Sequence, residues 1–169
     1  MLEVMPIPYE DKPLLQQLIQ FYRYDSSEFD GHALTQHGVY QYKYLDHQWT
    51  EEFRRPLLFK VDDEIAGFAL VILDIPKEFA KLSDANETNL ISDFFIMRKF
   101  RRNGYGMQAA HLIFDRFPGN WELRQTSNNT TANRFWNDVI NKYTGGDYRE
   151  VVMNGDEWRG PVQVFDTWK

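Results

Sequence analysis

The chain has 169 residues, of which 43% are hydrophobic and 26% are charged, so it has the composition of a globular protein with a sizeable core. The net charge of −6 argues against a general nucleic-acid binder, because such proteins carry a net basic face. The chain contains no cysteine, which excludes a disulfide framework, a thiolate zinc site and a cysteine nucleophile. We expect a single domain over residues 1–169, since no linker or internal repeat is visible.

The amino terminus lacks the basic and apolar regions of a signal peptide, and the longest apolar run, Ile65 to Leu73, is too short to cross a bilayer as a helix. We therefore expect a cytoplasmic protein with neither a membrane partner nor a nucleic-acid partner. The aromatic share of 16% is high, which is typical of a dense core or of an aromatic-walled ligand cleft.

Hydrophobic spacing and turn residues predict an alternation of strands and helices. Strand–helix–strand units with an inserted hairpin favour an α/β (α+β) fold, in which a mixed, mostly antiparallel central sheet is covered by helices. A parallel strand pair is expected around the helix that begins at Tyr105. In chain order the expected elements are a strand (2–7), a helix capped by Asp11, an irregular region of short helices and loops (25–52), a hairpin (56–61 and 65–73), a loop with a short helix (74–87), a strand (89–97), a helix (105–117), a strand (121–125), a helix around 132–140, and two strands (148–153 and 162–165).

The segment from Ile96 to Met107 is the most informative part of the sequence. It leads from an apolar strand through a basic, glycine-containing turn into a helix, and four of the chain's 19 basic residues fall within Arg98 to Arg102. Helix starts leave backbone N–H groups unpaired and carry partial positive charge, and glycines let a ligand approach the backbone closely. The turn is therefore predicted to bind a polyanion.

The turn differs from two known nucleotide-binding motifs. It does not match the P-loop pattern G-x-x-x-x-G-K-[ST]. Gly104, Gly106 and Ala109 fit the loose dinucleotide fingerprint, with Glu122 roughly 20 residues beyond, but only one strand–helix unit follows, too few for a doubly wound sheet. The pattern R-x-x-G-x-G at a helix start describes the turn better, although an ordinary strand-to-helix turn with a solvated basic face produces the same short pattern.

A second element, N-x-x-A followed by an aromatic pair, lies one helix and one strand later, at Asn129 to Trp136. In a structural interpretation Asn129 caps a helix and the aromatic residues belong to the core. In a functional one, the amide binds an amide-bearing cofactor arm that the aromatic residues enclose. Core packing is favoured for Phe135, and the two interpretations are balanced for Trp136.

Together, in this order and spacing, the two elements resemble the GNAT superfamily of acetyltransferases over about Pro56 to Tyr143, and the runs Ser92 to Phe95 and Phe117 to Glu122 are similar to a bacterial subgroup of predicted acetyltransferases. The resemblance implies an N-acyltransferase that moves an acetyl group from acetyl-CoA to an amine, without a metal. We expect direct attack in a ternary complex, because the chain has no cysteine and no serine in a recognisable nucleophile elbow. It also implies that the parallel strands diverge to admit the pantetheine arm. The implied coenzyme A contacts are Phe94, Phe95, Ile96, Arg101, Arg102, Asn103, Gly104, Tyr105, Gly106, Met107, Asn129, Phe135 and Trp136.

The sequence departs from the family at the catalytic positions. Many members have a tyrosine near the position of Trp136 that acts as a general acid and protonates the departing thiolate. An indole N–H cannot act as that acid. Tyr143 is nearby in sequence, but a core or surface role is favoured for it, as it is for His111. Asp93 is the nearest carboxylate to the family's general base. It is either that base or the partner of a neighbouring basic group, because a carboxylate in an apolar strand is costly to bury unless paired.

The acceptor is expected to be an amine of a small molecule or peptide, and a homodimer is left open. Two other functions compete: a non-catalytic acyl-CoA-binding sensor or interaction module on the same fold, and a nucleotide-binding regulator of another fold, which the missing P-loop disfavours. Aromatic and acidic residues of the amino-terminal half suit a cationic amine, although packing is favoured for most of them individually. They are Tyr22, Tyr24, Tyr40, Tyr42, Tyr44, His47, Trp49, Asp25, Glu28 and Asp30.

Overall fold

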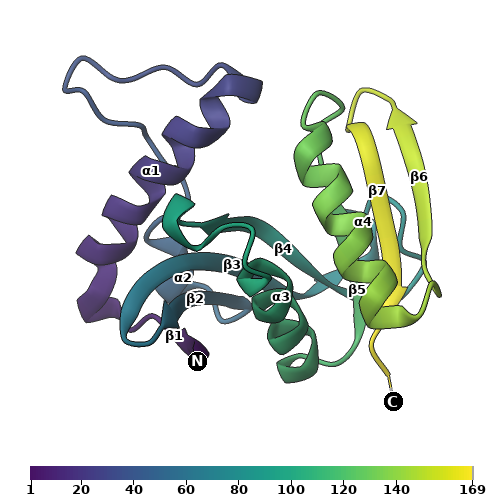
Figure 1. Ribbon diagram of the computed structural model, residues 1–169. Coiled ribbons are helices and arrows are strands. Elements are labelled where there is room, and N and C mark those ends of the chain that lie inside the picture. Colours follow the sequence, from purple (N-terminus) through teal and green to yellow (C-terminus); the bar gives the residue numbers. More distant parts are fainter. Residues whose placement is uncertain (169) are drawn as a thin grey trace.

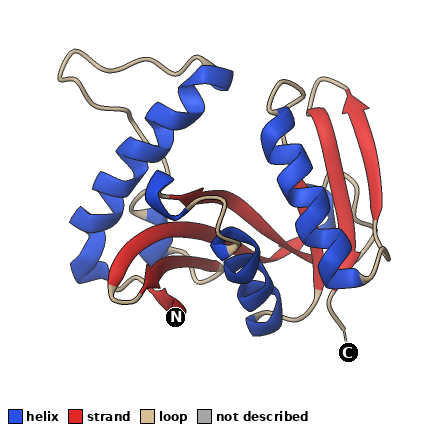
Figure 2. Cartoon of the chain, viewed as in Figure 1, coloured by secondary structure: helices blue, strands red, loops and turns tan. Residues whose placement is uncertain are grey.

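A computed structural model describes residues 1–168 of the chain. A seven-stranded sheet in the order β1-β2-β3-β4-β5-β7-β6 forms the centre, and helices pack on both of its faces (Figures 1 and 2). The strands are β1 (Leu2–Pro6), β2 (Arg54–Val61), β3 (Glu64–Pro76), β4 (Glu87–Ile96), β5 (Asn120–Arg124), β6 (Arg149–Asn154) and β7 (Arg159–Asp166); the helices are α1 (Lys12–Asp30), α2 (His47–Thr50), α3 (Tyr105–Arg116) and α4 (Thr130–Thr144).

The predicted fold class is confirmed. Neighbouring strands run antiparallel except β4 and β5, which are parallel and are connected by α3. The main difference lies in the region expected to be irregular, because α1 continues from Asp25 to Asp30 and ends at Gly31 in the left-handed conformation. Asp11 occupies the N-cap position of α1, but its side chain makes no capping hydrogen bond. No helix within residues 1–168 is long and apolar enough to cross a membrane.

Strand alternation divides the core into two layers, one on each face of the sheet. On β2, Leu57 and Phe59 belong to the layer that α3 and α4 cover, whereas Leu58 belongs to the layer that α1 covers. On β4, Phe94 and Phe95 divide between the two layers in the same way. This strand therefore connects both helical layers at the point where the sheet opens.

The parallel strands β4 and β5 separate after a short pairing. They pair only at Asn89 with Trp121 and at Leu90 with Glu122, so the divergence implied by the family resemblance is present. A bulge places Ser92 outside the β3–β4 register. Beyond it, β4 pairs with β3 alone, which leaves the other edge of the strand open to an extended ligand.

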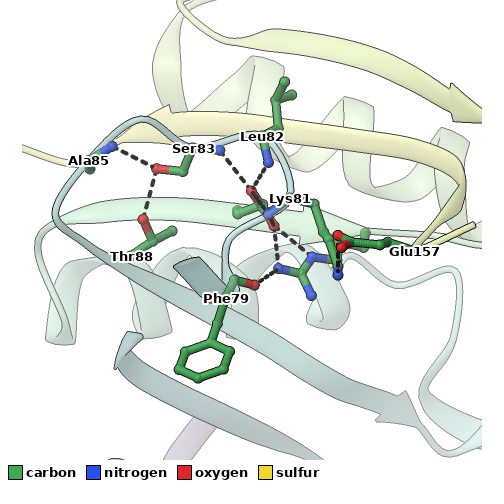
Figure 3. A network of polar contacts seen from close by, with 9 residues as sticks. Phe79, Lys81, Leu82, Ser83, Ala85, Thr88 and Glu157 are labelled. Carbon is green, nitrogen blue, oxygen red and sulfur yellow. Dashed lines mark hydrogen bonds and ion pairs between the residues drawn. The ribbon is translucent and has the colours of Figure 1, made fainter. Parts of the chain in front are cut away.

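Glu122 of β5 holds the loop between β3 and β4, of which Figure 3 labels Lys81, Leu82 and Ser83. Its fully buried carboxylate accepts hydrogen bonds from the backbone N–H groups of Lys81, Leu82 and Ser83, and it pairs with Arg124. Burial opposes the ionisation of Glu122, but the backbone donors and Arg124 outweigh burial and hold its pKa below the ordinary range. Glu122 is therefore committed to the loop and does not serve the ribose contact that a dinucleotide fold requires.

Candidate functional site

A cavity of about 770 Å³ is lined by α1, β4, the turn before α3, and α4. Its volume lies within the range of small-molecule and cofactor sites. Asn103 and Tyr105 are not on its wall: the side chain of Asn103 bonds back to the carbonyl of Arg101, and Tyr105 packs against Phe100. The other residues expected to contact coenzyme A all line it, namely Phe94, Phe95, Ile96, Arg101, Arg102, Gly104, Gly106, Met107, Asn129, Phe135 and Trp136.

The turn before α3 is shaped by two left-handed residues, Arg102 with φ 61° and Gly104 with φ 80°. The amide of Arg101 is bonded within the turn to the carbonyl of Arg98. The amides from Tyr105 to Met107 belong to the first turn of α3 and have no preceding helical carbonyl to bond to. Successive amides in such a turn, together with the positive end of the helix dipole, form an anion site.

Two of the basic residues in this turn are paired with Asp25 of α1. Nη2 of Arg101 lies 2.8 Å from Oδ2 of Asp25, and Nη2 of Arg98 lies 3.2 Å from Oδ1 of the same carboxylate. Arg102 lines the cavity and forms no ion pair with any residue from 1 to 168. Arg102 is therefore the side chain in the turn with charge to spare for an anionic ligand.

Gly106 serves the packing of α4 on α3. A Cβ at this position would lie 3.1 Å from Cε2 of Phe135. The ring centroid of Trp136 lies 5.0 Å from that of Phe135 and 5.0 Å from that of Phe94, in edge-to-face geometry. Trp136 is only 8% exposed, so the structure places it in the core at the cavity wall.

Two other candidates, Asn129 and Tyr143, have structural partners. Oδ1 of Asn129 accepts the amide of Ala132 at 3.1 Å, which is the N-cap bond of α4. The hydroxyl of Tyr143 donates to Asp115 at 2.8 Å, and burial together with this carboxylate raises the pKa of Tyr143 to about 12. Tyr143 and His111 are on neither cavity wall, so Tyr143 is not placed to replace the missing tyrosine.

A second cavity, of about 920 Å³, begins along β4 where the first one ends. Leu90, Ser92 and Asp93 line the second cavity, whereas the residues from Phe94 to Ile96 line the first. Asp93 therefore stands at the boundary between the two cavities.

The close partners of Asp93 are hydroxyl groups. No basic side chain within residues 1–168 forms an ion pair with it. Its Oδ2 accepts hydrogen bonds from Tyr42 at 2.5 Å and from Ser92 at 3.0 Å. Burial and the nearby Asp93 carboxylate raise the pKa of Tyr42 far above its ordinary range, and they raise that of Tyr22 as well. Both phenols therefore stay protonated at neutral pH and act as donors.

The residues expected on the acceptor side separate into groups. Tyr42 and Tyr44 line the second cavity, and Tyr22, Asp25 and Glu28 line the first. The remaining ones are on neither wall: Tyr24, Asp30, Tyr40, His47 and Trp49. Sequence reasoning missed four residues of the second cavity that come from separate elements and share no local motif: Arg23, Phe53, Arg54 and Arg124.

Comparisons with known proteins identify the family and similar folds. The family model "Acetyltransferase (GNAT) family" matches residues 15–138. An acetyltransferase from Thermus thermophilus is similar in structure, with a TM-score of 0.70 and 19% identity over 98% of this chain and 97% of that chain. An aminoglycoside acetyltransferase in complex with coenzyme A has a TM-score of 0.66 and 14% identity over 98% and 95% of the two chains. The ribosomal-protein-S18-alanine N-acetyltransferase from Escherichia coli has a TM-score of 0.56 and 11% identity over 97% and 91%. No curated protein gives a significant sequence match.

Proposed function

The chain belongs to the GNAT acetyltransferase family, and on that premise we propose that it is an N-acetyltransferase that moves an acetyl group from acetyl-CoA to an amine. The observation that carries the proposal is the divergence of β4 from β5 directly beside the anion-binding turn of α3. An open strand edge next to a phosphate site suits a cofactor that has both a diphosphate and a peptide-like arm.

Donor groups along the first cavity support its assignment to coenzyme A. In this proposal the amides of the turn and of the first turn of α3 hold the diphosphate, and Arg102 supplies the neighbouring positive charge. The backbone N–H of Met97 donates a hydrogen bond to the carbonyl of Ala66 in β3. Alternation along the ladder then turns the N–H groups of Phe94 and Ile96 away from β3, toward the pantetheine arm.

In this proposal acetyl transfer takes place at the boundary between the two cavities, beside Asp93. Bound acetyl-CoA supplies a thioester whose thiolate is a good leaving group. Asp93 takes the proton that the amine nitrogen loses, directly or through a water molecule, and Tyr42 orients its carboxylate. In this proposal the backbone N–H of Phe94, the free donor next to Asp93, stabilises negative charge on the acetyl oxygen, and that of Ile96 bonds to the pantetheine arm. The amine attacks the acetyl carbon directly, so no residue of the chain is acetylated on the way.

The test combines binding with turnover. Calorimetry should show that the purified protein binds coenzyme A, and a thiol-release assay with a panel of amines should yield an acetylated product in mass spectra. Coenzyme A binding without acetylation of any amine supports the second candidate function, a non-catalytic acyl-CoA sensor. The observation that favours this candidate is Trp136, which stands near the position where many family members have a tyrosine acid. Failure to bind coenzyme A contradicts both functions.

A further inference from the structure

The second cavity contains a cation that the described part of the chain leaves without a counter-ion. Three arginines line this cavity: Arg54 pairs with Glu51 at 2.6 Å, and Arg124 pairs with Glu122 at 2.5 Å. Arg23 is half-buried and forms no ion pair within residues 1–168, and its buried Nε has no hydrogen-bond partner. Partly desolvating a guanidinium is costly without an anion or acceptor to compensate it. An anionic group of a ligand would supply that partner.

Arg23 and Asp93 are linked through one tyrosine. Cζ of Arg23 lies 5.2 Å from the centroid of the Tyr42 ring, and the hydroxyl of the same ring donates to Asp93. All three residues line the second cavity. The cavity therefore presents a cation at the face of the ring and a carboxylate at its hydroxyl end.

Apart from Asp74, Ser92 and the two paired arginines, the rest of this cavity is mostly apolar, and its hydrocarbon wall is formed by Phe53, Ile72, Leu73, Ile75, Phe79 and Leu90. A polyamine or an amino sugar would bring further hydroxyl or ammonium groups against this wall and would leave Arg23 without an anion. A zwitterion with an apolar body matches all three features of the cavity.

Resting on the proposed function, we propose that the acceptor is an α-amino acid with an apolar side chain, whose carboxylate is bound by Arg23 and whose amine lies at Asp93. A guanidinium binds a carboxylate through two parallel hydrogen bonds, which fixes the orientation of the amino acid. The neutral amine forms the N–C bond to the acetyl carbon as the C–S bond breaks. The proton lost by nitrogen passes to Asp93, the coenzyme A thiolate takes up a proton, and the product is an N-acetyl amino acid.

The experiment compares matched acceptors with the wild-type protein and with Arg23→Gln. Leucine, methionine and phenylalanine are each assayed beside the corresponding amide and the decarboxylated amine, which keep the side chain and lose the carboxylate. The free amino acid should have the highest kcat/KM, and Arg23→Gln should lower that value by about tenfold to a hundredfold, the effect of one charged hydrogen-bonded pair. The values for the amides and for coenzyme A binding should not change. Arg55→Gln is the matched control, because Arg55 is exposed and lines neither cavity.

Several outcomes would overturn the inference while the proposed function stands: amides or decarboxylated amines that react as well as the amino acids, or an Arg23→Gln effect that is equal for all three classes. Loss of coenzyme A binding in the wild-type protein would instead sink the proposed function. If coenzyme A binds and no amine is acetylated, calorimetry with the amino acids decides. Binding that Arg23→Gln abolishes supports the acceptor site, and absence of binding overturns it.

Discussion

The hydroxyl of Tyr42 donates to Oδ2 of Asp93 at 2.5 Å, so a residue from the loop after α1 orients the carboxylate at the boundary of the two cavities. Asp93→Asn preserves the shape of this side chain and removes its capacity to accept a proton. We expect kcat to fall by about 10²–10⁴-fold, the usual contribution of a general base, and its pH dependence to change. Coenzyme A affinity should stay nearly intact, because Asp93 is not on the wall of the first cavity. Unchanged turnover across the pH range would eliminate Asp93 as the base.

Gly104 has φ 80° and is the N-cap of α3, in the turn that is proposed to bind the diphosphate. Gly104→Val should weaken coenzyme A binding strongly, because a branched side chain strains the left-handed backbone and crowds the amides that face the diphosphate. Arg101→Ala should cost less, since the backbone donors remain. The matched control is Gly145→Val, which meets the same backbone strain at φ 67° beyond the end of α4 and lines neither cavity. Equal affinities for coenzyme A in wild type and Gly104→Val, measured by calorimetry, would refute the site.

Gly106 allows the close approach of Phe135. Gly106→Ala should forfeit the stability of about 0.5–1 kcal/mol that alanine normally adds to a helix, because the new Cβ lies against Phe135, and urea unfolding should show this cost. The cost should shrink when Phe135→Ala is present, because the ring that the new Cβ meets is then absent. Gly155→Ala is the control, as its Cβ would meet nothing within 4 Å. Additive effects of the two substitutions would contradict the packing role.

Glu122 gives the stability of the fold a defined pH dependence. Its folded-state pKa is lowered, so its contribution is present above the unfolded-state pKa and is lost as the pH falls through the folded-state pKa. Glu122→Gln should destabilise the protein at pH 7 by about 1–3 kcal/mol, since backbone donors would face an amide. The difference from wild type should narrow below about pH 4. Urea unfolding at pH 7 and below about pH 4 measures this difference in the free energy of unfolding. The control is Glu157→Gln, which removes the charge of an exposed partner of Lys81 and should change the free energy of unfolding little.

Direct transfer predicts that the protein itself is not acetylated. Intact-mass measurement after mixing the protein with acetyl-CoA in the absence of an amine should give the unmodified mass, because the chain has no cysteine and no residue is proposed to take up the acetyl group. A stable acetyl adduct that disappears when an amine is added would replace direct transfer with a covalent route.

The sequence alone predicted the features that depend on neighbouring residues. Hydrophobic period and turn residues are local, so they placed the hairpin, the strands β4 and β5, the helix between them and the basic turn, and thereby the fold class. The end of α1 escaped prediction for a related reason. Its buried residues, Leu15, Leu18 and Ile19, all lie in the first half of the helix, so the half that includes Asp25 has no apolar stripe for a periodic pattern to detect.

Only the tertiary structure decided which side chains meet. The sequence suggested that Gly106 admits a ligand, and the structure adds that Gly106, which lines the first cavity, also admits Phe135 of another helix. Nothing local indicates that Arg23 lies over the ring of Tyr42, or that Tyr42 bonds to Asp93. These contacts join α1, a loop and β4 on the face of the sheet that α1 covers, and they arise because the helices on each face must cover the apolar residues that alternate along the strands.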